Sequence, residues 1–380
     1  MIKRDSWIRR IEFAWERVPI VWLTGVRRVG KTTLAKAFTD AAYVNCDLPR
    51  NRERLSDPEF FFSECEAARI ILDEVHQLEN PSELLKIAAD EFPDKQVLAT
   101  GSSTLAATAK FRDSLTGRKR TVFLPPVLAT ELQAFGDVPM ERRLLHGGLP
   151  GCLLASEVDP EFYSEWLDSY FARDVQELFR IGKRTEFLKL TEILIRNSGG
   201  FAEVTSLAKQ SGLTRPTVLS YLEVLELTHV VHRLRPFHAG GKREILAQPK
   251  VYAFDSGFVC HCRGWTALRA EDQGLLFEGL VLGALRTLIP SQPVQYWRDK
   301  SEREVDFVIP RAGSKVDAFE CKWNTAKFSP THLEVFRSHY PEGKNYLVVP
   351  SGQMIERRRF NGIEATILPL PLMSEKAFGR

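Results

Sequence analysis

The spacing of apolar residues predicts two kinds of element in the first third of the chain. Short apolar runs, typical of buried strands, lie at 20–23, 43–47, 69–72, 96–100 and 121–124. Helices are predicted between them, one of which ends near Thr39, and another over 7–16. Strands that alternate with helices predict a parallel sheet of the α/β class, in which ligands bind at the carboxyl ends of the strands.

Helical spacing continues over residues 141–185. Within this segment, 165–180 carries an apolar stripe that we expect to pack on the first domain. The stripe consists of Trp166, Tyr170, Phe171, Val175 and Leu178.

Residues 186–236 predict a different module. Helices are expected at 187–195, 204–210 and 215–225, with Gly212 in the turn before the third helix. A strand at 230–234 and a loop containing two glycines follow. A helix–turn–helix succeeded by strand, loop and strand is the winged-helix pattern, whose third helix commonly enters the DNA major groove.

The candidate DNA contacts of this module are polar and basic residues. They are Thr214 (also the cap of the third helix), Arg215, Thr217 and Tyr221 on its expected exposed face, and Lys242 and Arg243 in the wing. Basic wings contact phosphates. Winged helices also bind proteins, and a face with few arginines argues against sequence-specific readout of bases.

The last domain is expected to begin near Pro249, with a helix at 274–287 and strands at 304–309 and 316–323. The short loop between the two strands predicts a hairpin. Because side chains alternate along a strand, Glu320 and Lys322 share one face, and we expect both to converge on Asp306.

The order Glu278, Asp306, Glu320, Lys322 resembles the PD-(D/E)xK nuclease core. In that arrangement the three carboxylates would bind Mg²⁺ and Lys322 would position or activate the attacking water. Two alternatives stay open. The carboxylates can instead form an ion pair with Lys322, and such folds also persist as inactive binding platforms.

Candidate chemistry is most specific after the first strand, where residues 25–32 match the phosphate-binding pattern G-x-x-x-x-G-K-[ST]. The predicted nucleotide-binding residues are Gly25, Val26, Arg27, Arg28, Val29, Gly30, Lys31, Thr32 and Thr33. Glycines let the backbone surround phosphate oxygens. Lys31 would reach the β- and γ-phosphates of ATP, and the Thr32 hydroxyl would ligate Mg²⁺. An ordinary glycine turn is the alternative.

The apolar strand at 69–72 ends in two carboxylates, as the partner motif of such a loop requires. Asp73 would hold the Mg²⁺, and Glu74 would polarise the water that attacks the γ-phosphate. The strand at 96–100 leads to Ser102 and Ser103, one of which would sense the γ-phosphate. A helix cap is the alternative role for a serine at that place.

Arg118 is the candidate arginine finger, supplied to the nucleotide of a neighbouring subunit to neutralise charge in the transition state. Arg112 and Arg173 compete for this role. A solvated basic loop would explain the same residues.

Composition narrows the function classes only a little further. The 380 residues are 44% hydrophobic and 27% charged, as in ordinary globular chains. The net charge of +3 is too small to establish a nucleic-acid partner. No apolar run reaches the roughly 20 residues that span a bilayer, and no signal-peptide core is evident, so we expect a cytoplasmic location. The six cysteines are scattered, unlike a disulfide framework.

Several motifs occur in the order found in one known family. They are GVRRVGKTTL (25–34), LDEV (72–75), ATGSS (99–103), LTGR (115–118), GGLP (147–150), YFARDV (170–175), PKVYAFDSG (249–257) and EVDFVI (304–309). Together they resemble the prokaryotic AAA-type ATPases that carry a C-terminal DUF4143 domain. The resemblance implies a P-loop ATPase domain, a winged helix and a nuclease-like C-terminal domain.

The predicted domains are a P-loop ATPase core (1–140), a helical lid (141–185), a winged helix (186–247) and a nuclease-like domain (248–380). We expect an oligomeric ATPase, for which a ring is one arrangement, that uses ATP and Mg²⁺. We expect it to act on DNA as a motor or remodeller, including branched or structured DNA. A nucleotide-controlled switch or scaffold for protein partners is the alternative. An ATP-licensed metal-dependent nuclease is a third.

Overall fold

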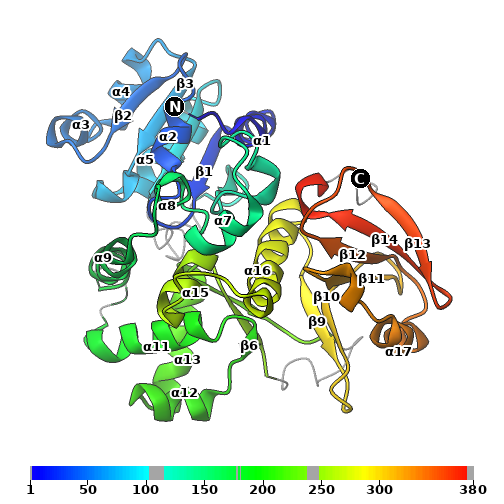
Figure 1. Ribbon diagram of the computed structural model, residues 1–380. Coiled ribbons are helices and arrows are strands. Elements are labelled where there is room, and N and C mark those ends of the chain that lie inside the picture. The colour runs from blue at the N-terminus through cyan, green and yellow to red at the C-terminus, as the bar shows by residue number, and fades with distance from the viewer. Residues whose placement is uncertain (1, 102–114, 177–178, 180, 238–247, 375–380) are drawn as a thin grey trace. The chain divides into compact units, whose positions relative to one another are not determined.

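The computed structural model describes the chain except for residues 1, 102–114, 177–178, 180, 238–247 and 375–380. Contacts divide the chain into two compact units (Figure 1). The first consists of Met1–Pro125, Glu165–Gly182 and Leu227–His229. The second consists of Pro126–Ser164, Lys183–Glu226 and Val230–Arg380.

The first unit is built on a parallel sheet whose five described strands have the order β2-β3-β4-β1-β5. They are β1 (Ile20–Thr24), β2 (Ala42–Asn45), β3 (Arg69–Asp73), β4 (Gln96–Thr100) and β5 (Lys119–Phe123). The predicted α/β class with a parallel sheet is confirmed. Since β4 lies between β1 and β3, its last residue ends beside both the glycine loop and Asp73.

Helices pack against the first sheet and form a hydrophobic core with it. The helices are α1 (Asp5–Trp15), α2 (Lys31–Ala35), α3 (Pro49–Arg54), α4 (Pro58–Glu64) and α5 (Pro81–Glu91). Trp22 from β1 and Phe62 from α4 are fully buried in the core beneath them. The helix after the glycine loop is shorter than predicted, because the amides of Ala37 and Phe38 bond three residues back rather than four, which tightens the turn.

The segment with the apolar stripe contains α9 (Pro160–Tyr170), followed by a π-helical turn over Phe171–Gln176. Its stripe residues in the first unit are buried, as expected: Trp166, Tyr170, Phe171 and Val175. Leu178 lies outside the described residues.

In the second unit, α7 (Met140–His146) and α8 (Pro150–Leu154) precede the predicted helix–turn–helix. That module contains α11 (Arg184–Arg196), α12 (Val204–Ser211) and α13 (Arg215–Leu227). A three-stranded antiparallel sheet accompanies it, in the order β6 (Gly200–Phe201), β8 (Lys250–Ala253), β7 (Val231–Leu234). The boundary predicted at residue 248 falls before β8, whereas β8 is the central strand of this sheet.

A buried ion pair gives a structural role to two of the family motifs noted above, GGLP (147–150) and PKVYAFDSG (249–257). The Asp255 carboxylate accepts a 2.6 Å hydrogen bond from the amide of Gly148 and lies 3.7 Å from a guanidinium nitrogen of Arg143. Gly147 has φ 78°, and a Cβ there would lie 2.0 Å from the Asp255 carboxylate, so no larger residue fits. The backbone of the GGLP motif therefore leaves room for the carboxylate of Asp255, the residue that caps the start of α15 (Ser256–Arg263).

The C-terminal part of the second unit begins with α16 (Ala270–Leu288) and ends in a mixed sheet with the order β13-β14-β12-β11-β10-β9. The strands are β9 (Gln295–Arg298), β10 (Glu304–Pro310), β11 (Val316–Cys321), β12 (Asn345–Val349), β13 (Glu356–Phe360) and β14 (Ile363–Pro369). The predicted hairpin is present, since β10 and β11 pair antiparallel. Helix α17 (Thr331–His339) joins β11 to the parallel strand β12.

None of the helices in the described ranges combines the length and the hydrophobicity needed to cross a bilayer.

Candidate functional site

The glycine loop lies between β1 and α2, where its conformation depends on two glycines. Gly25 has φ 149° and Gly30 has φ 101°, both on the side of the backbone map that glycine adopts most readily. A Cβ on Gly25 would lie 2.4 Å from the carbonyl oxygen of Leu124. Val26 and Val29 are buried and anchor the loop, so its backbone amides are held in place by apolar packing.

Lys31 and Thr32 stand at the start of α2 with their polar groups in the loop. The Lys31 ammonium donates to the carbonyl oxygens of Gly25 at 2.8 Å and Val26 at 3.1 Å. Burial lowers the pKa of Lys31, and the nearby carboxylates of Glu74 and Asp174 oppose that effect only in part. A cation fixed in this way fits the phosphates of a nucleotide.

The Asp73 carboxylate at the end of β3 is 2% exposed and accepts hydrogen bonds from three hydroxyl groups. The donors are Thr32 Oγ1 at 3.3 Å, Tyr43 Oη at 2.6 Å and Thr100 Oγ1. Burial and Asp73 together raise the pKa of Tyr43, which keeps that phenol a donor. These partners are neutral, and the Asp73 oxygens together with the Thr32 hydroxyl are ligands that Mg²⁺ accepts.

Glu74 follows Asp73 in the left-handed region, with φ 60°, a conformation that is strained for a residue other than glycine. Its amide donates to Thr100 Oγ1 at 3.1 Å, and its carboxylate lies 3.1 Å from Nδ1 of His76. Burial alone would raise the pKa of Glu74, but His76 and Lys31 outweigh it and the pKa is lowered. The side chain is therefore an ionised carboxylate, as a general base must be.

The π-helical turn and α9 both contact the glycine loop at Arg27. A guanidinium nitrogen of Arg27 lies 3.5 Å from the Asp174 carboxylate, and the indole of Trp166 donates to the Arg27 carbonyl oxygen at 3.1 Å. Arg4 donates to the carbonyl oxygens of Val29 and Pro125, both at 3.3 Å. Sequence reasoning missed these contacts as well as Tyr43, Thr100 and His76.

The other predicted members of this site have mixed outcomes. Ser102, Ser103 and Arg112 lie outside the described residues, and the polar residue placed at the tip of β4 is Thr100. Arg118 forms a bidentate contact with Asp90, at 2.5 Å and 3.1 Å. Arg173 is exposed on the π-helical turn.

A parallel sheet, a glycine loop ahead of α2 and an acidic residue at the end of β3 define the P-loop nucleotide-binding fold. The family comparisons agree. A model described as "AAA domain" matches residues 17–133, and one described as "Domain of unknown function (DUF4143)" matches residues 273–373. The chain carries an AAA domain and a DUF4143 domain, as its motifs predicted. The winged helix and the nuclease-like fold that the resemblance also implied stay predictions. A second domain of unknown function, DUF8612, matches residues 139–269.

Individual proteins are similar over most of the chain. An uncharacterized protein of Mycobacterium tuberculosis is 27% identical over 326 residues, which cover 82% of this chain and 72% of that protein. One of Methanocaldococcus jannaschii is 23% identical over 348 residues, covering 81% and 75%. Among solved structures, a Walker-type ATPase of Pyrococcus abyssi is 18% identical, covers 69% of this chain and 96% of its own, and has a TM-score of 0.45.

The predicted DNA-contact face of α13 needs one correction. Thr214 and Arg215 are exposed, and the hydroxyl groups of Thr214 and Thr217 lie 2.8 Å apart at the start of the helix. Tyr221 is buried instead, with its ring packed against Phe187 at 5.1 Å. The prediction for Tyr221 was wrong because it occupies an apolar helical position. Lys242 and Arg243 lie outside the described residues.

In the C-terminal sheet, Lys322 lies between two of the predicted metal ligands. Its ammonium is 2.8 Å from the Glu320 carboxylate and 3.6 Å from that of Asp306. Asp306 sits where the β9–β10 register shifts, between Val305 and Val308, and accepts a 2.7 Å hydrogen bond from the amide of Cys321. The bulge turns this carboxylate toward the end of β11.

Glu278 on α16 accepts a 3.2 Å hydrogen bond from Tyr252, and burial together with Asp306 raises its pKa to about 8. Within the described part of the chain, no group of three His, Cys, Asp or Glu residues is arranged to hold a metal ion. Asp306, Glu320 and Lys322 do converge as expected, and the metal site predicted from Glu278, Asp306 and Glu320 stays a prediction. The ion pair, given above as one alternative, is what the structure has.

Proposed function

We propose that this protein is an ATPase that couples hydrolysis to work on DNA. The observation that carries the proposal is the arrangement at the end of β3, where the Asp73 carboxylate is held by three neutral hydroxyls while Lys31 is held apart in the loop. Thr32 and Asp73 would hold Mg²⁺, which when bound neutralises phosphate charge. Glu74 would take the proton of the attacking water, with Thr100 fixing its backbone.

The direct test is the rate of ATP hydrolysis by the full chain with single-stranded, duplex and branched DNA. A motor or remodeller should turn over many-fold faster with one of these substrates. Mass measured with and without nucleotide gives the oligomeric state in the same samples. A rate that none of the three DNA structures changes would contradict the DNA part of the proposal while leaving the ATPase part in place.

We propose further that Arg118 acts on the nucleotide of a neighbouring subunit. In the described chain it is held by Asp90 on the surface of the first unit, so it would have to exchange this partner for a phosphate. Mixing Arg118→Ala with Glu74→Gln subunits should restore part of the activity, since one kind of interface then has both groups intact. Full turnover by an Arg118→Ala protein that remains a monomer with ATP would remove this role.

DNA contact is proposed for the helix–turn–helix, through Thr214, Arg215 and Thr217 together with Lys242 and Arg243. Three helices accompanied by the β6-β8-β7 sheet support a winged helix. Changing Arg215, Lys242 and Arg243 to Ala together should weaken DNA binding and flatten its salt dependence, because fewer counterions are released. Unchanged binding at every salt concentration would favour a protein partner.

A second candidate function, a nucleotide-controlled switch that binds proteins, is favoured by one observation. The outer face of α13 exposes Leu219, which is 47% exposed, and also the acidic Glu223. An apolar and an acidic residue suit a protein surface better than a phosphate backbone. For the C-terminal domain we propose a binding role, in which the Lys322 ammonium stays paired with Asp306 and Glu320.

A further inference from the structure

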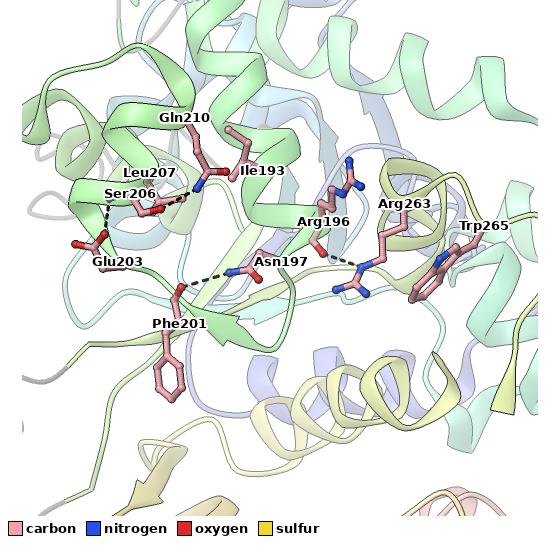
Figure 2. Close-up of a pocket in the computed structure, with 10 residues that line it drawn as sticks. All are labelled: Ile193, Arg196, Asn197, Phe201, Glu203, Ser206, Leu207, Gln210, Arg263 and Trp265. Carbon is pink, nitrogen blue, oxygen red and sulfur yellow. Dashed lines mark hydrogen bonds between the residues drawn. The ribbon is translucent and has the colours of Figure 1, made fainter. Parts of the chain in front are cut away.

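A cavity of about 620 Å³ opens in the second unit, beside α12 and the ends of α11 and α15 (Figure 2). Ligand pockets in proteins have volumes of roughly 300–1,000 Å³, so the space can take a molecule of ordinary cofactor size. Its lining combines apolar side chains, among them Ile193 and Leu207, with the basic residues Arg196 and Arg263 and with Trp265. None of the residues assigned above to ATP or to the acidic cluster lines it.

Arg263 is fixed in position before any ligand binds. Its Nε donates to the carbonyl oxygen of Arg196 at 2.7 Å, and its guanidinium lies 4.8 Å from the ring centre of Trp265. Burial lowers the pKa of Arg263 although Asp272 opposes the effect, which means that the cation is partly removed from water. No carboxylate in the described ranges forms an ion pair with Arg263. The hydrogen bond through Nε holds the guanidinium in place and does not use its two terminal nitrogens. A guanidinium that is held in this way and partly desolvated is suited to bidentate contact with an oxyanion.

The second arginine adds to this charge. Arg196 is exposed at the end of α11 and lines the same cavity, as Figure 2 shows. The acidic residue of the lining, Glu203, stays ionised, because the amides of Thr205, at 3.0 Å, and Ser206 donate to its carboxylate at the start of α12 and lower its pKa. The two arginines still leave the lining with an excess of positive charge. The cavity is therefore positively charged on the side of α11 and α15.

The remaining lining groups suit a planar, polar ring. Trp265 offers an aromatic surface, and Asn197 and Gln210 supply amides whose NH₂ groups already donate within the protein, to Phe201 O at 3.3 Å and to Ser206 Oγ at 2.9 Å. Their amide oxygens can then accept from a ligand. A nucleobase presents both an aromatic face and donor groups at its edge.

We propose that this cavity binds a nucleoside phosphate unit, with the phosphate on Arg196 and Arg263 and the base against Trp265 and the apolar side chains. The unit can come from a free nucleotide or from a strand of single-stranded DNA. The site goes beyond the proposed ATPase, because it shares no residue with the glycine loop and requires no hydrolysis.

The test uses the full chain without ATP and measures fluorescence anisotropy of a labelled oligodeoxythymidine of about ten nucleotides, within the usual site size for single strands. A labelled thymidine monophosphate is titrated in parallel. Arg263→Gln and Arg196→Gln should each lower the affinity about tenfold, as loss of a charge-assisted hydrogen bond does. Trp265→Leu should lower it by a similar factor through lost stacking. Lys209→Gln, an exposed cation on α12 outside the lining, is the matched control.

The outcomes distinguish a free nucleotide from a DNA strand as the ligand, and they can also contradict the proposed site. If the oligonucleotide binds far more tightly than the monophosphate and loses affinity in the arginine variants, a DNA strand is the source. Equal affinity for both, with the same variant sensitivity, assigns a free nucleotide. Arginine variants that bind both probes as wild type does, or wild type that binds neither, would overturn the proposal. Arg196→Gln keeps the test valid if Arg263→Gln lowers the melting temperature, since Arg196 is exposed. Because ATP is absent, none of these outcomes depends on the ATPase.

Discussion

Two sites in this chain each bring aspartate, glutamate and lysine together, and they differ in where the lysine is held. At the glycine loop, Lys31 donates to two backbone carbonyls, and Asp73 accepts from three hydroxyl groups. In the C-terminal sheet, Lys322 itself is the partner of Glu320 and Asp306. Neutral hydroxyls satisfy a carboxylate without cancelling its charge, whereas an ammonium cancels it.

The difference decides which site remains available to a ligand. In the first unit, Lys31 and Asp73 are held by different, uncharged groups, which leaves one available to a phosphate and the other to a metal ion. In the C-terminal sheet, the Lys322 ammonium lies against both carboxylates and offsets part of their charge. Residue type alone therefore does not identify a metal site. The partner that each charge already has must be known.

The largest effect is expected from Lys31→Ala. ATP affinity should fall by about a hundredfold, since the loop loses a cation whose charge-assisted hydrogen bonds contribute about 1.5–3 kcal/mol each. Isothermal titration calorimetry with Mg-ATP measures this, with Arg50→Ala, an exposed cation of the same unit, as control. Wild-type affinity in the Lys31→Ala protein would end the nucleotide assignment.

Glu74→Gln should separate binding from turnover. Binding of Mg-ATP should be kept, while hydrolysis should fall by about 10²–10⁴-fold because the general base is lost. Phosphate release is the measurement, and Glu79→Gln, an exposed glutamate just after the same strand, is the control. Hydrolysis at the wild-type rate by Glu74→Gln would assign the base elsewhere.

Lys322→Ala tests the C-terminal site of this comparison. It leaves Glu320 and Asp306 close together without their cation, and breaking such a buried pair costs about 3 kcal/mol or more. The unfolding temperature should drop, and added Mn²⁺ should restore part of it by replacing the ammonium. Lys327→Ala, an exposed lysine nearby in the chain, is the control. A variant that melts like wild type and ignores Mn²⁺ would show that the pair is not structural.

A further expected effect is a dependence of stability on pH through Glu278. Its pKa in the folded protein is about 8, raised from 4.5 by burial and Asp306, so the folded state binds a proton that the unfolded state has lost. Stability from this group should therefore fall as pH rises from about 5 to 8. Glu278→Gln should remove this component and be more stable than wild type at pH 8. The same slope in thermal melts of both proteins would contradict the assignment.

The glycine loop and the acidic strand could be predicted because each is a local pattern. Gly25, Gly30 and Lys31 lie within seven residues, and their spacing is fixed by the phosphate they surround. The hydroxyls around Asp73 could not be predicted in this way. Thr100 and Tyr43 are 27 and 30 residues from it, and only the strand order brings them together.

Contacts between residues still farther apart in the sequence were even harder to predict. Arg27 and Asp174 are 147 residues apart, and a π-helical turn gives no periodic signal in the sequence. Tyr221 is different, because a signal was present. With Val218, Leu222 and Leu225 it forms the i, i+3, i+4, i+7 spacing of a buried helix face, and all four are buried. The spacing should have outweighed the winged-helix analogy.

The measurement that tests the central comparison most directly is the number of Mn²⁺ ions bound per chain, by electron paramagnetic resonance, with and without ATP. The account predicts a single ion per chain with ATP, lost in Asp73→Asn, and no tightly bound ion without nucleotide. An ion bound without ATP that survives Asp73→Asn but is lost in Asp306→Asn would contradict it, because the lysine-paired cluster would then be the metal site.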